Sequence, residues 1–173
     1  EVQGVKAYPS ITELSKTDVP ECAIVCVPAK FVPGLVDECG KCGVKGMIII
    51  TAGFSEMGEE GKKLYRQIDE YRKRYGIRIV GPNCLGIMTP PAKFNGSFGG
   101  AMVLNGTVGF VSQSGALGTA VLDWSLQAKV GFSAFVSAGA MMDVGWGDLI
   151  RYLGNDPDTD RKSTRLNSSH RIR

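Results

Sequence analysis

The chain has 173 residues, of which 43% are hydrophobic, so it can form one domain or two small ones with an ordinary buried core. Its formal net charge is +3, but residues 160–173 hold five of the 20 basic and one of the 17 acidic residues, which leaves a body of net charge −1. A near-neutral body gives no electrostatic reason to expect nucleic acid as a partner. The longest apolar runs, such as CAIVCV, have six residues, far fewer than the roughly twenty needed to span a bilayer, so no membrane segment is expected.

The first half of the chain alternates apolar, β-branched runs with stretches of helical periodicity. The strands are expected at residues 22–27, 46–51 and 77–80, and the helices at residues 32–42 and 59–75. The first strand is apolar throughout and ends at Pro28, which is typical of a central parallel strand buried on both faces. Gly43 and Gly76 follow the two helices directly, where glycine is the preferred stop.

The second half repeats this alternation after an irregular stretch. Residues 81–106 are rich in Gly, Pro, Asn and Ser and are expected to form a linker without regular elements, with the domain boundary near Gly100. Strands are then expected at residues 107–112 and 132–137, and helices at residues 115–128 and 146–153. The sequence thus predicts an α/β fold with a doubly wound parallel sheet, whose functional groups lie where the strands end.

Residues 160–173 differ in composition from everything before them and contain the only histidine, His170. Translated back into codons, Asp160 to His170 resembles one reading frame of a common sequencing-library adapter, so we expect a non-native tail and exclude it from the fold prediction. The alternative is a genuine basic, disordered tail that binds nucleic acid or an acidic surface. The expected domains are therefore residues 1–100 and 101–159, and the body has no imidazole for acid–base, metal or phosphoryl chemistry.

The most informative turn comprises Ser112, Gln113, Ser114 and Gly115, between the strand VGFVS and the helix ALGTAVLDW. A helix N-terminus with unpaired amides and small hydroxyl residues makes a phosphate or phosphoryl site. On spacing alone, Ser112 or Ser114 could equally be a helix cap. A third interpretation, Ser114 as a hydrolase nucleophile, lacks the first glycine of G-x-S-x-G and a histidine in the body.

Three further turns follow the three strands of the first half. They are Val27-Pro28, Thr51-Ala52-Gly53-Phe54 and Gly81-Pro82-Asn83-Cys84. Adjacent parallel strand ends converge on one crevice, which is where open sheets bind nucleotide-like ligands. Each turn taken alone is common punctuation between elements, so only their combination indicates a ligand site.

The five cysteines are odd in number and lie in apolar or helical contexts, which indicates reduced thiols and a cytoplasmic protein. Cys39 and Cys42 have C-x-x-C spacing and could form a redox pair or half of a zinc site. They fall late in a predicted helix, where no N-terminal amides stabilise a thiolate, and no second pair has ligand spacing. We therefore expect no metal site.

Several longer motifs resemble one family. GPNCLG and VSQSGALGTAVLDW, followed by GFSAFVSAGAMMDVGWGDLIRYLGNDPDT, are similar to the acyl-CoA synthetase superfamily that includes ADP-forming acetate-CoA ligases and the α-subunit of succinyl-CoA synthetase. AYPSI, IVCVPAKFV and ITAGFSEMGEEG extend the resemblance, so it covers residues 5–159. It implies a Rossmann-like CoA-binding domain followed by the start of a flavodoxin-like ligase domain.

The resemblance also implies a reaction and a set of binding residues. An acyl-CoA and phosphate give an acyl phosphate, a histidine takes the phosphoryl group, and the phosphohistidine passes it reversibly to ADP. CoA would lie along Val27, Pro28, Ile50, Thr51, Ala52, Asn83 and Cys84, with Cys84 near its thiol. Ser112, Gln113, Ser114 and Gly115 would hold the phosphoryl group.

Departures from the family pattern qualify this expectation. The first βαβ unit would precede Glu1 and the phosphorylated histidine would follow Thr159, so the fragment alone is expected to be inactive. ADP or ATP with Mg²⁺ would bind an ATP-grasp domain or subunit outside this chain, in an oligomeric assembly. Thr119 and Gln113 stand where succinate-specific members have tyrosine and arginine, which favours acetate or another small acyl group; Ala140 replaces an asparagine.

Two alternatives stay open at this point. The same pair of domains occurs in protein lysine acetyltransferases, where the ligase-like part senses CoA esters, and the phrase MMDVGWGDLI keeps that interpretation open. The chain could also belong to a non-catalytic CoA-binding protein, which would bind CoA without nucleotide-dependent turnover.

Overall fold

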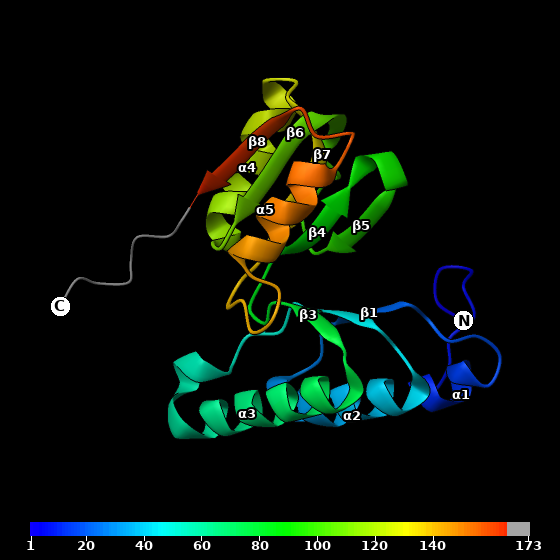
Figure 1. Ribbon diagram of the computed structural model, residues 1–173. Helices are drawn as coiled ribbons and strands as arrows, with labels where there is room; N and C mark the ends of the chain where they lie inside the picture. Colours follow the sequence, from blue (N-terminus) through cyan, green and yellow to red (C-terminus); the bar gives the residue numbers. More distant parts are fainter. Residues whose placement is uncertain (166–173) are drawn as a thin grey trace. The chain divides into compact units, whose positions relative to one another are not determined.

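The computed structural model describes residues 1–165, which divide into two compact units (Figure 1). The first unit comprises Glu1–Met47 and Gly53–Arg78, and the second comprises Ile48–Ala52 and the chain from Ile79 onward. The division by compactness therefore assigns the ends of two early strands to the second unit. The domain boundary near Gly100 stays a prediction.

The first unit is built from strand and helix in alternation. Its elements are α1 (Ile11–Ser15), β1 (Cys22–Val25), the 3-10 turn η1 (Ala29–Phe31), α2 (Val32–Cys42), β2 (Gly46–Ile49), the 3-10 turn η2 (Ser55–Met57), α3 (Gly58–Tyr75) and β3 (Arg78–Val80). The strands form a sheet of order β1-β2-β3. Both predicted helices are confirmed, and both stops hold left-handed glycines, Gly43 with φ 90° and Gly76 with φ 67°.

The prediction that β1 is a central strand buried on both faces is wrong within the described chain. β1 lies at the end of the strand order, next to β2 alone. Cys22 is exposed and Ile24 keeps 43% of its surface accessible, while Val25 is buried. A continuous apolar run does not distinguish an edge strand from a central one, because burial depends on what covers the strand.

Helices α2 and α3 lie side by side in the first unit (Figure 1). A Cβ atom at Gly40 would fall well inside contact distance of the Tyr75 ring, so the absence of a side chain on α2 lets this ring pack against the helix. The Tyr75 hydroxyl donates to Asp37 Oδ1 at 2.7 Å, and Ile68 of α3 is fully buried. The face of α3 that carries Tyr75 therefore packs along α2.

The second unit contains a mixed five-stranded sheet. Its elements are β4 (Gly86–Thr89), the 3-10 turn η3 (Pro90–Ala92), β5 (Phe94–Ser97), β6 (Leu104–Ser112), α4 (Gly115–Gln127), β7 (Gly131–Ser137), α5 (Trp146–Asn155) and β8 (Arg161–Arg165). The strand order is β5-β4-β7-β6-β8. β6 runs parallel to β7 and β8, and β4 runs antiparallel to β5 and β7.

The expectation that residues 81–106 form an irregular linker is wrong. They contain the hairpin of β4 and β5, and β4 also pairs with β7 through Gly86–Ser137 to Met88–Phe135. A strand of four residues containing Gly and Met gives little β-propensity signal, so tertiary pairing decides its structure. The parallel prediction for the strands flanking α4, in contrast, is confirmed by the register of β6 and β7.

The core of the second unit has two layers because neighbouring residues of a strand face opposite sides. On one face, α4 contributes Leu122 to a cluster with Phe110 of β6 and Phe135 of β7. On the other face, α5 contributes Leu149 and Leu153 to a cluster that includes Val111 of β6. The sheet is therefore covered by α4 on one side and α5 on the other.

Strand β8 falls inside the segment that was excluded from the fold prediction. It pairs in parallel with β6, from Val108–Arg161 to Ser112–Arg165. A ladder uses backbone groups that every residue except proline supplies, so the pairing does not depend on what the side chains are. The non-native tail at residues 160–173 stays a prediction, and its part beyond residue 165 lies outside the described residues. No helix within residues 1–165 is both long and apolar enough to cross a bilayer.

Candidate functional site

The turn between β6 and α4 is held by its own serines. Ser112 is buried, its hydroxyl donates to the Ser114 carbonyl oxygen, and it accepts from the Ser114 amide, both at 3.1 Å. Ser114 is the N-cap of α4, and its hydroxyl oxygen accepts from the Leu117 amide at 3.2 Å. The capping interpretation is thus confirmed for Ser114. Ser112 is not a cap, and its buried hydroxyl stabilises the turn through its two hydrogen bonds to the Ser114 backbone.

This geometry leaves donors at the start of α4. Among the hydrogen bonds of residues 1–165, the amides of Gly115 and Ala116 have no partner, as is usual for the first turn of a helix. Gln113, Ser114 and Gly115 are half-buried rather than enclosed. The turn can therefore present backbone donors and partial positive charge to an anion, although the buried Ser112 hydroxyl is already engaged.

A cavity of about 570 Å³ lies beside this helix start, within the second unit. It is lined by Ile50, Thr51, Ala52, Asn83, Cys84, Leu85, Phe98, Gly115, Ala116 and Thr119. Five of the seven predicted CoA-binding residues and one of the four predicted phosphate-binding residues thus line one cavity. Val27 and Pro28 belong to the first unit, and Ser112, Gln113 and Ser114 do not line the cavity.

The Asn83 wall of the cavity is fixed by backbone hydrogen bonds from two directions. The Asn83 amide donates to the Thr51 carbonyl oxygen at 2.9 Å, which ties the two predicted turns together. From the other side, the loop after β7 contributes two amides, with Ala140 donating to Pro82 O at 2.8 Å and Met142 donating to Gly81 O at 3.0 Å. Three backbone hydrogen bonds therefore tie the Asn83 turn to its neighbours.

Gly139 allows the loop after β7 to lie close to the backbone of Pro82 and Asn83. It has φ 57°, a conformation that side chains with a Cβ rarely adopt, and a Cβ there would run into the carbonyl oxygens of Pro82 and Asn83. Asp143 adds a side-chain contact farther along the loop, where its Oδ2 accepts from the Ile79 amide at 2.9 Å. The loop at residues 138–144 thus holds the Asn83 turn against the sheet.

Cys84 is a buried wall residue and not an activated nucleophile. Its side chain is 4% exposed, and its Sγ donates to the Ile49 carbonyl oxygen at 3.3 Å. Burial raises the pKa of the thiol from its ordinary value of 9.0 to about 11. The thiol is therefore protonated at neutral pH and offers an apolar, uncharged surface to the cavity.

Sequence reasoning missed three lining residues, Leu85, Phe98 and Ala116, and treated Thr119 only as a departure from a family pattern. Thr119 could have been found, because it lies four positions after Gly115 on a predicted helix and shares its face, and Ala116 lies three positions before Thr119 on that helix. Phe98 had no such signal, since its loop was assigned to an irregular linker.

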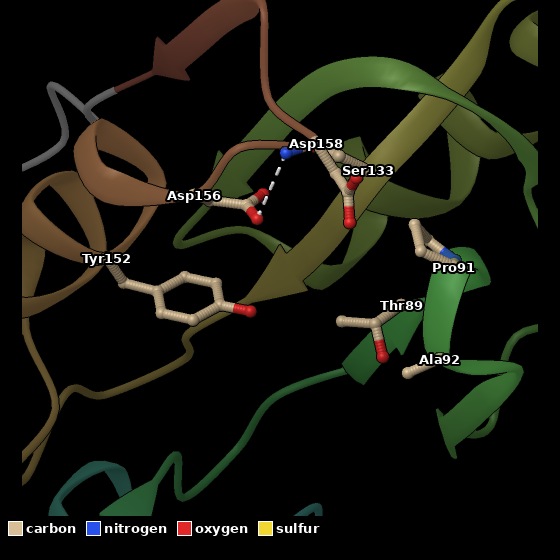
Figure 2. Close-up of a pocket in the computed structure, with 7 residues that line it drawn as sticks. All are labelled: Thr89, Pro91, Ala92, Ser133, Tyr152, Asp156 and Asp158. Atoms are coloured by element: carbon tan, nitrogen blue, oxygen red, sulfur yellow. Dashed lines mark hydrogen bonds between the residues drawn. The ribbon is translucent and has the colours of Figure 1, made fainter.

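A second cavity of about 320 Å³ lies between β4, β7 and α5, again within the second unit. Figure 2 shows its lining residues, Thr89, Pro91, Ala92, Ser133, Tyr152, Asp156 and Asp158. Asp156 stabilises the turn that follows α5, because its carboxylate accepts hydrogen bonds from the Asp158 amide and from the Thr159 hydroxyl. Burial, with the charges of Asp156 and Asp158, raises the pKa of Tyr152. The Asp156 carboxylate is therefore engaged in stabilising the end of α5.

The cysteine pair at Cys39 and Cys42 shows no sign of activation. Cys39 is buried within α2, and burial raises the pKa of its thiol to about 11. All five cysteines are free thiols. Within residues 1–165, no three His, Cys, Asp or Glu side chains are grouped so that they could hold a metal ion.

A helix N-terminus beside an uncharged cavity at strand ends is the arrangement with which α/β proteins hold anionic, nucleotide-like ligands. Comparison with known families is more specific. Residues 1–90 match the model of a CoA binding domain, and residues 105–168 match that of a succinyl-CoA ligase like flavodoxin domain. The chain belongs to the family that carries these two domains in succession, as its motifs indicate.

Named relatives support the same assignment. The α subunit of ADP-forming acetate–CoA ligase I from Pyrococcus furiosus is 46% identical over 89% of this chain, and the ADP-forming 4-hydroxybutyrate–CoA ligase of Nitrosopumilus maritimus is 37% identical over 90%. The matched regions are 33% and 22% of those proteins, so the chain spans at most about a third of the relatives named here.

Solved structures share the fold. PH0766 from Pyrococcus horikoshii OT3 matches with a TM-score of 0.90 and 42% identity, over 96% of this chain and 38% of its own. The dinucleotide forming acetyl-coenzyme A synthetase 1 of Ca. Korarchaeum cryptofilum, solved with phosphate and ADP, matches with a TM-score of 0.90 and 37% identity, over 96% of this chain and 35% of its own. The α/β fold predicted from the sequence is therefore confirmed.

Proposed function

We propose that this chain is the CoA-binding and phosphate-facing part of an ADP-forming acyl-CoA synthetase. The whole protein would convert an acyl-CoA, ADP and phosphate reversibly into a carboxylic acid, ATP and CoA. The observation that carries the proposal is the cavity in which Thr51, Asn83 and Cys84 meet the first turn of α4. One such cavity can hold a thioester next to a group that attracts phosphate.

In the first step, a phosphate oxygen attacks the thioester carbonyl carbon, the carbon–sulfur bond breaks, and the thiolate leaves as CoA. The product is an acyl phosphate. The amides of Gly115 and Ala116 are placed to stabilise the phosphoryl oxygens, because both residues line the cavity and neither amide has a partner among residues 1–165. Cys84 stays a neutral thiol and does not compete with CoA sulfur for the acyl group.

The remaining binding residues follow from the same proposal. Val27 and Pro28 would contact CoA, and so would Ile50 and Ala52, which line the cavity. Gln113 and Ser114 would border the phosphoryl group, while Ser112 acts through the turn that it stabilises. Second-step chemistry belongs to a histidine elsewhere in the whole protein, since the one histidine of this chain is His170.

ADP and Mg²⁺ would bind an ATP-grasp domain or partner subunit outside this chain. The Pyrococcus furiosus relative is named as an α subunit, which supports a multi-subunit assembly. The five free thiols favour a reducing compartment such as the cytoplasm. The relatives named above are ligases, so we propose a ligase rather than a CoA-ester sensor within an acetyltransferase.

CoA binding by this chain tests the proposal directly. Ala116→Glu would place a carboxylate in the cavity at the first turn of α4, where a negative charge stabilises a helix and does not unfold it. We expect the affinity for acetyl-CoA, measured by calorimetric titration, to fall by at least about tenfold. Ala120→Glu is the matched control, because Ala120 is exposed on the same helix and lies outside the cavity.

The control variant should bind acetyl-CoA within about twofold of the original chain, a difference well below 1 kcal/mol. Equal affinities for the two glutamate variants would contradict the assignment of this cavity. A chain that binds neither CoA nor acetyl-CoA would remove the proposed function altogether.

A further inference from the structure

One wall of the cavity beside α4 is a turn of three consecutive residues, Asn83, Cys84 and Leu85, all in the second unit. Leu85 ends this turn, because β4 begins at the next residue. The Leu85 amide donates to Ser137 Oγ at 3.0 Å, and the Leu85 carbonyl oxygen accepts from the Phe98 amide at 3.2 Å. Of these two hydrogen bonds, only the one to Ser137 depends on the identity of a side chain.

Ser137 places a hydroxyl in an otherwise apolar layer at the end of β7. Its side chain is 0% exposed, and it faces the same side of the sheet as Phe135, since strand residues two apart share a face. Phe135 packs on that side in the apolar cluster with Leu122 of α4. A buried hydroxyl is unfavourable there unless it forms hydrogen bonds, and this one accepts from the Leu85 amide. Ser137 therefore contributes a specific bond and not apolar packing.

The position of Leu85 sets how closely the turn lies to the start of α4. A Cβ on Gly115 would lie 3.9 Å from the Leu85 amide nitrogen, and a Cβ on Gly118 would lie 3.4 Å from Leu85 Cδ2. Because both residues are glycines, the turn packs directly against the helix. The same Leu85 nitrogen thus donates to Ser137 and lies beside Gly115, whose amide has no partner within residues 1–165. A shift of Leu85 would change the gap between the turn and the first amides of α4.

We propose that Ser137 is a positioning residue for the proposed reaction. Its hydroxyl holds Leu85, and with it the turn from Asn83 to Leu85, at the distance from α4 that a bound CoA thioester requires. Ser137 does not line the cavity, so it acts through Leu85 and not by contact with the ligand. This inference rests on the proposed function, because it assumes that a CoA thioester occupies the cavity.

Ser133 supplies a matched control on the same strand. Its side chain is 3% exposed, and its hydroxyl is hydrogen-bonded to the Thr159 hydroxyl at 2.7 Å. It lines the second cavity and not the one beside α4. Ser133→Ala and Ser137→Ala each remove one buried hydroxyl together with its hydrogen bond, so both should lower the midpoint of urea denaturation. Only Ser137→Ala should change the ligand site.

Titration of the full chain with acetyl-CoA tests the proposal. In calorimetry, Ser137→Ala should bind acetyl-CoA about five- to tenfold more weakly, and Ser133→Ala should stay within about twofold of the original chain. Hydrogen exchange followed by NMR adds a local readout, because the Leu85 amide should exchange at least about tenfold faster than other core amides of Ser137→Ala but not of Ser133→Ala. Ser137→Cys keeps a weak acceptor of similar size, so it should lose only about two- to fivefold in affinity.

The outcomes separate this inference from the function beneath it. Faster exchange at Leu85 without a loss of acetyl-CoA affinity would overturn the positioning role, while the proposed function would stand. An equal loss of affinity in Ser133→Ala would assign the effect to general destabilisation and would also overturn the inference. If Ser137→Ala does not fold, Ser137→Cys decides, and an affinity equal to that of the original chain refutes the role. A chain that binds neither CoA nor acetyl-CoA overturns the proposed function and this inference together.

Discussion

Cys84 links the cavity wall to the pH dependence of stability. Its thiol is buried against the Ile49 carbonyl oxygen, and burial raises its pKa from 9.0 to about 11. The unfolded chain loses this proton near pH 9, whereas the folded chain keeps it until about pH 11. Between these values the folded state binds more protons, so the free energy of unfolding falls as pH rises. Below pH 9 the contribution of Cys84 is fully present.

We therefore expect the original chain to lose about 1 kcal/mol more stability than Cys84→Ala between about pH 8 and about pH 10. Urea unfolding at the two pH values, in the presence of a reductant, measures both losses. Cys26→Ala serves as the control, because Cys26 is an exposed thiol. If the curves of Cys84→Ala and the original chain stay parallel across this range, the thiol does not contribute as described.

Gly139 is the second residue with a sharp prediction. Gly139→Ala should lower the free energy of unfolding by about 2 kcal/mol, because φ 57° is strained for alanine and its Cβ would displace the Asn83 turn. The affinity for CoA should fall as well, since Asn83 lines the cavity.

Gly154 offers the matched control for this substitution. It lies in α5, and a Cβ added there would meet no atom within 4 Å, so Gly154→Ala should raise stability by about 0.5 to 1 kcal/mol. Chemical denaturation gives both values. If both alanine variants change the free energy of unfolding by the same small amount, the loop at residues 138–144 can move to accommodate the new Cβ, which contradicts the prediction.

For individual residues, the sequence predicted which turns lie at the site but not what each side chain does there. Thr51, Asn83 and Cys84 could be predicted to converge because each follows a strand of one sheet. The engagement of Ser112 inside its turn could not, because hydroxyl geometry depends on backbone dihedrals that the residue type does not determine. Phe98 lay beyond prediction because its neighbours carry no periodicity.

Among the elements, α4 depends on its cap. Ser114→Ala removes the acceptor for the Leu117 amide and should lower the free energy of unfolding by about 1 kcal/mol. Ser114→Asp should retain most of the stability, because a carboxylate can accept the same bond and favours the helix N-terminus. Urea denaturation at neutral pH compares the three chains. An aspartate variant no more stable than the alanine variant would contradict the capping role.

Helices were predicted more accurately than strands, for a physical reason. The bounds of α2 were predicted to the residue, and α3 begins one residue before its predicted start, because helical periodicity and a terminal glycine are both local signals. β4 and β5 were missed because a strand depends on partners far away in sequence, here β7. The same dependence explains why β1 lies at an edge although its composition is typical of a central strand.

On the scale of the molecule, the expected non-native segment can be tested by removal. A chain ending at Asp160 loses β8 and its ladder with β6, but it keeps α4, α5 and both clusters that cover the sheet. We expect it to retain its circular dichroism spectrum and its CoA affinity within about twofold. Loss of cooperative unfolding on truncation would show that residues 161–173 are part of the folded structure, which contradicts the prediction of a non-native tail. A chain ending at Asn155 provides a contrast, because it also removes Thr159, whose hydroxyl bonds to buried Ser133.

Because Gly40 lies so close to the Tyr75 ring, the size of the side chain at one of these positions, 35 residues apart, limits the size at the other. A methyl group at position 40 would force the ring outward and break its hydroxyl bond to Asp37, unless position 75 became smaller at the same time. Proteins that share this helix pair should therefore vary the two positions jointly, and an aligned set of sequences would reveal the pair as correlated substitutions.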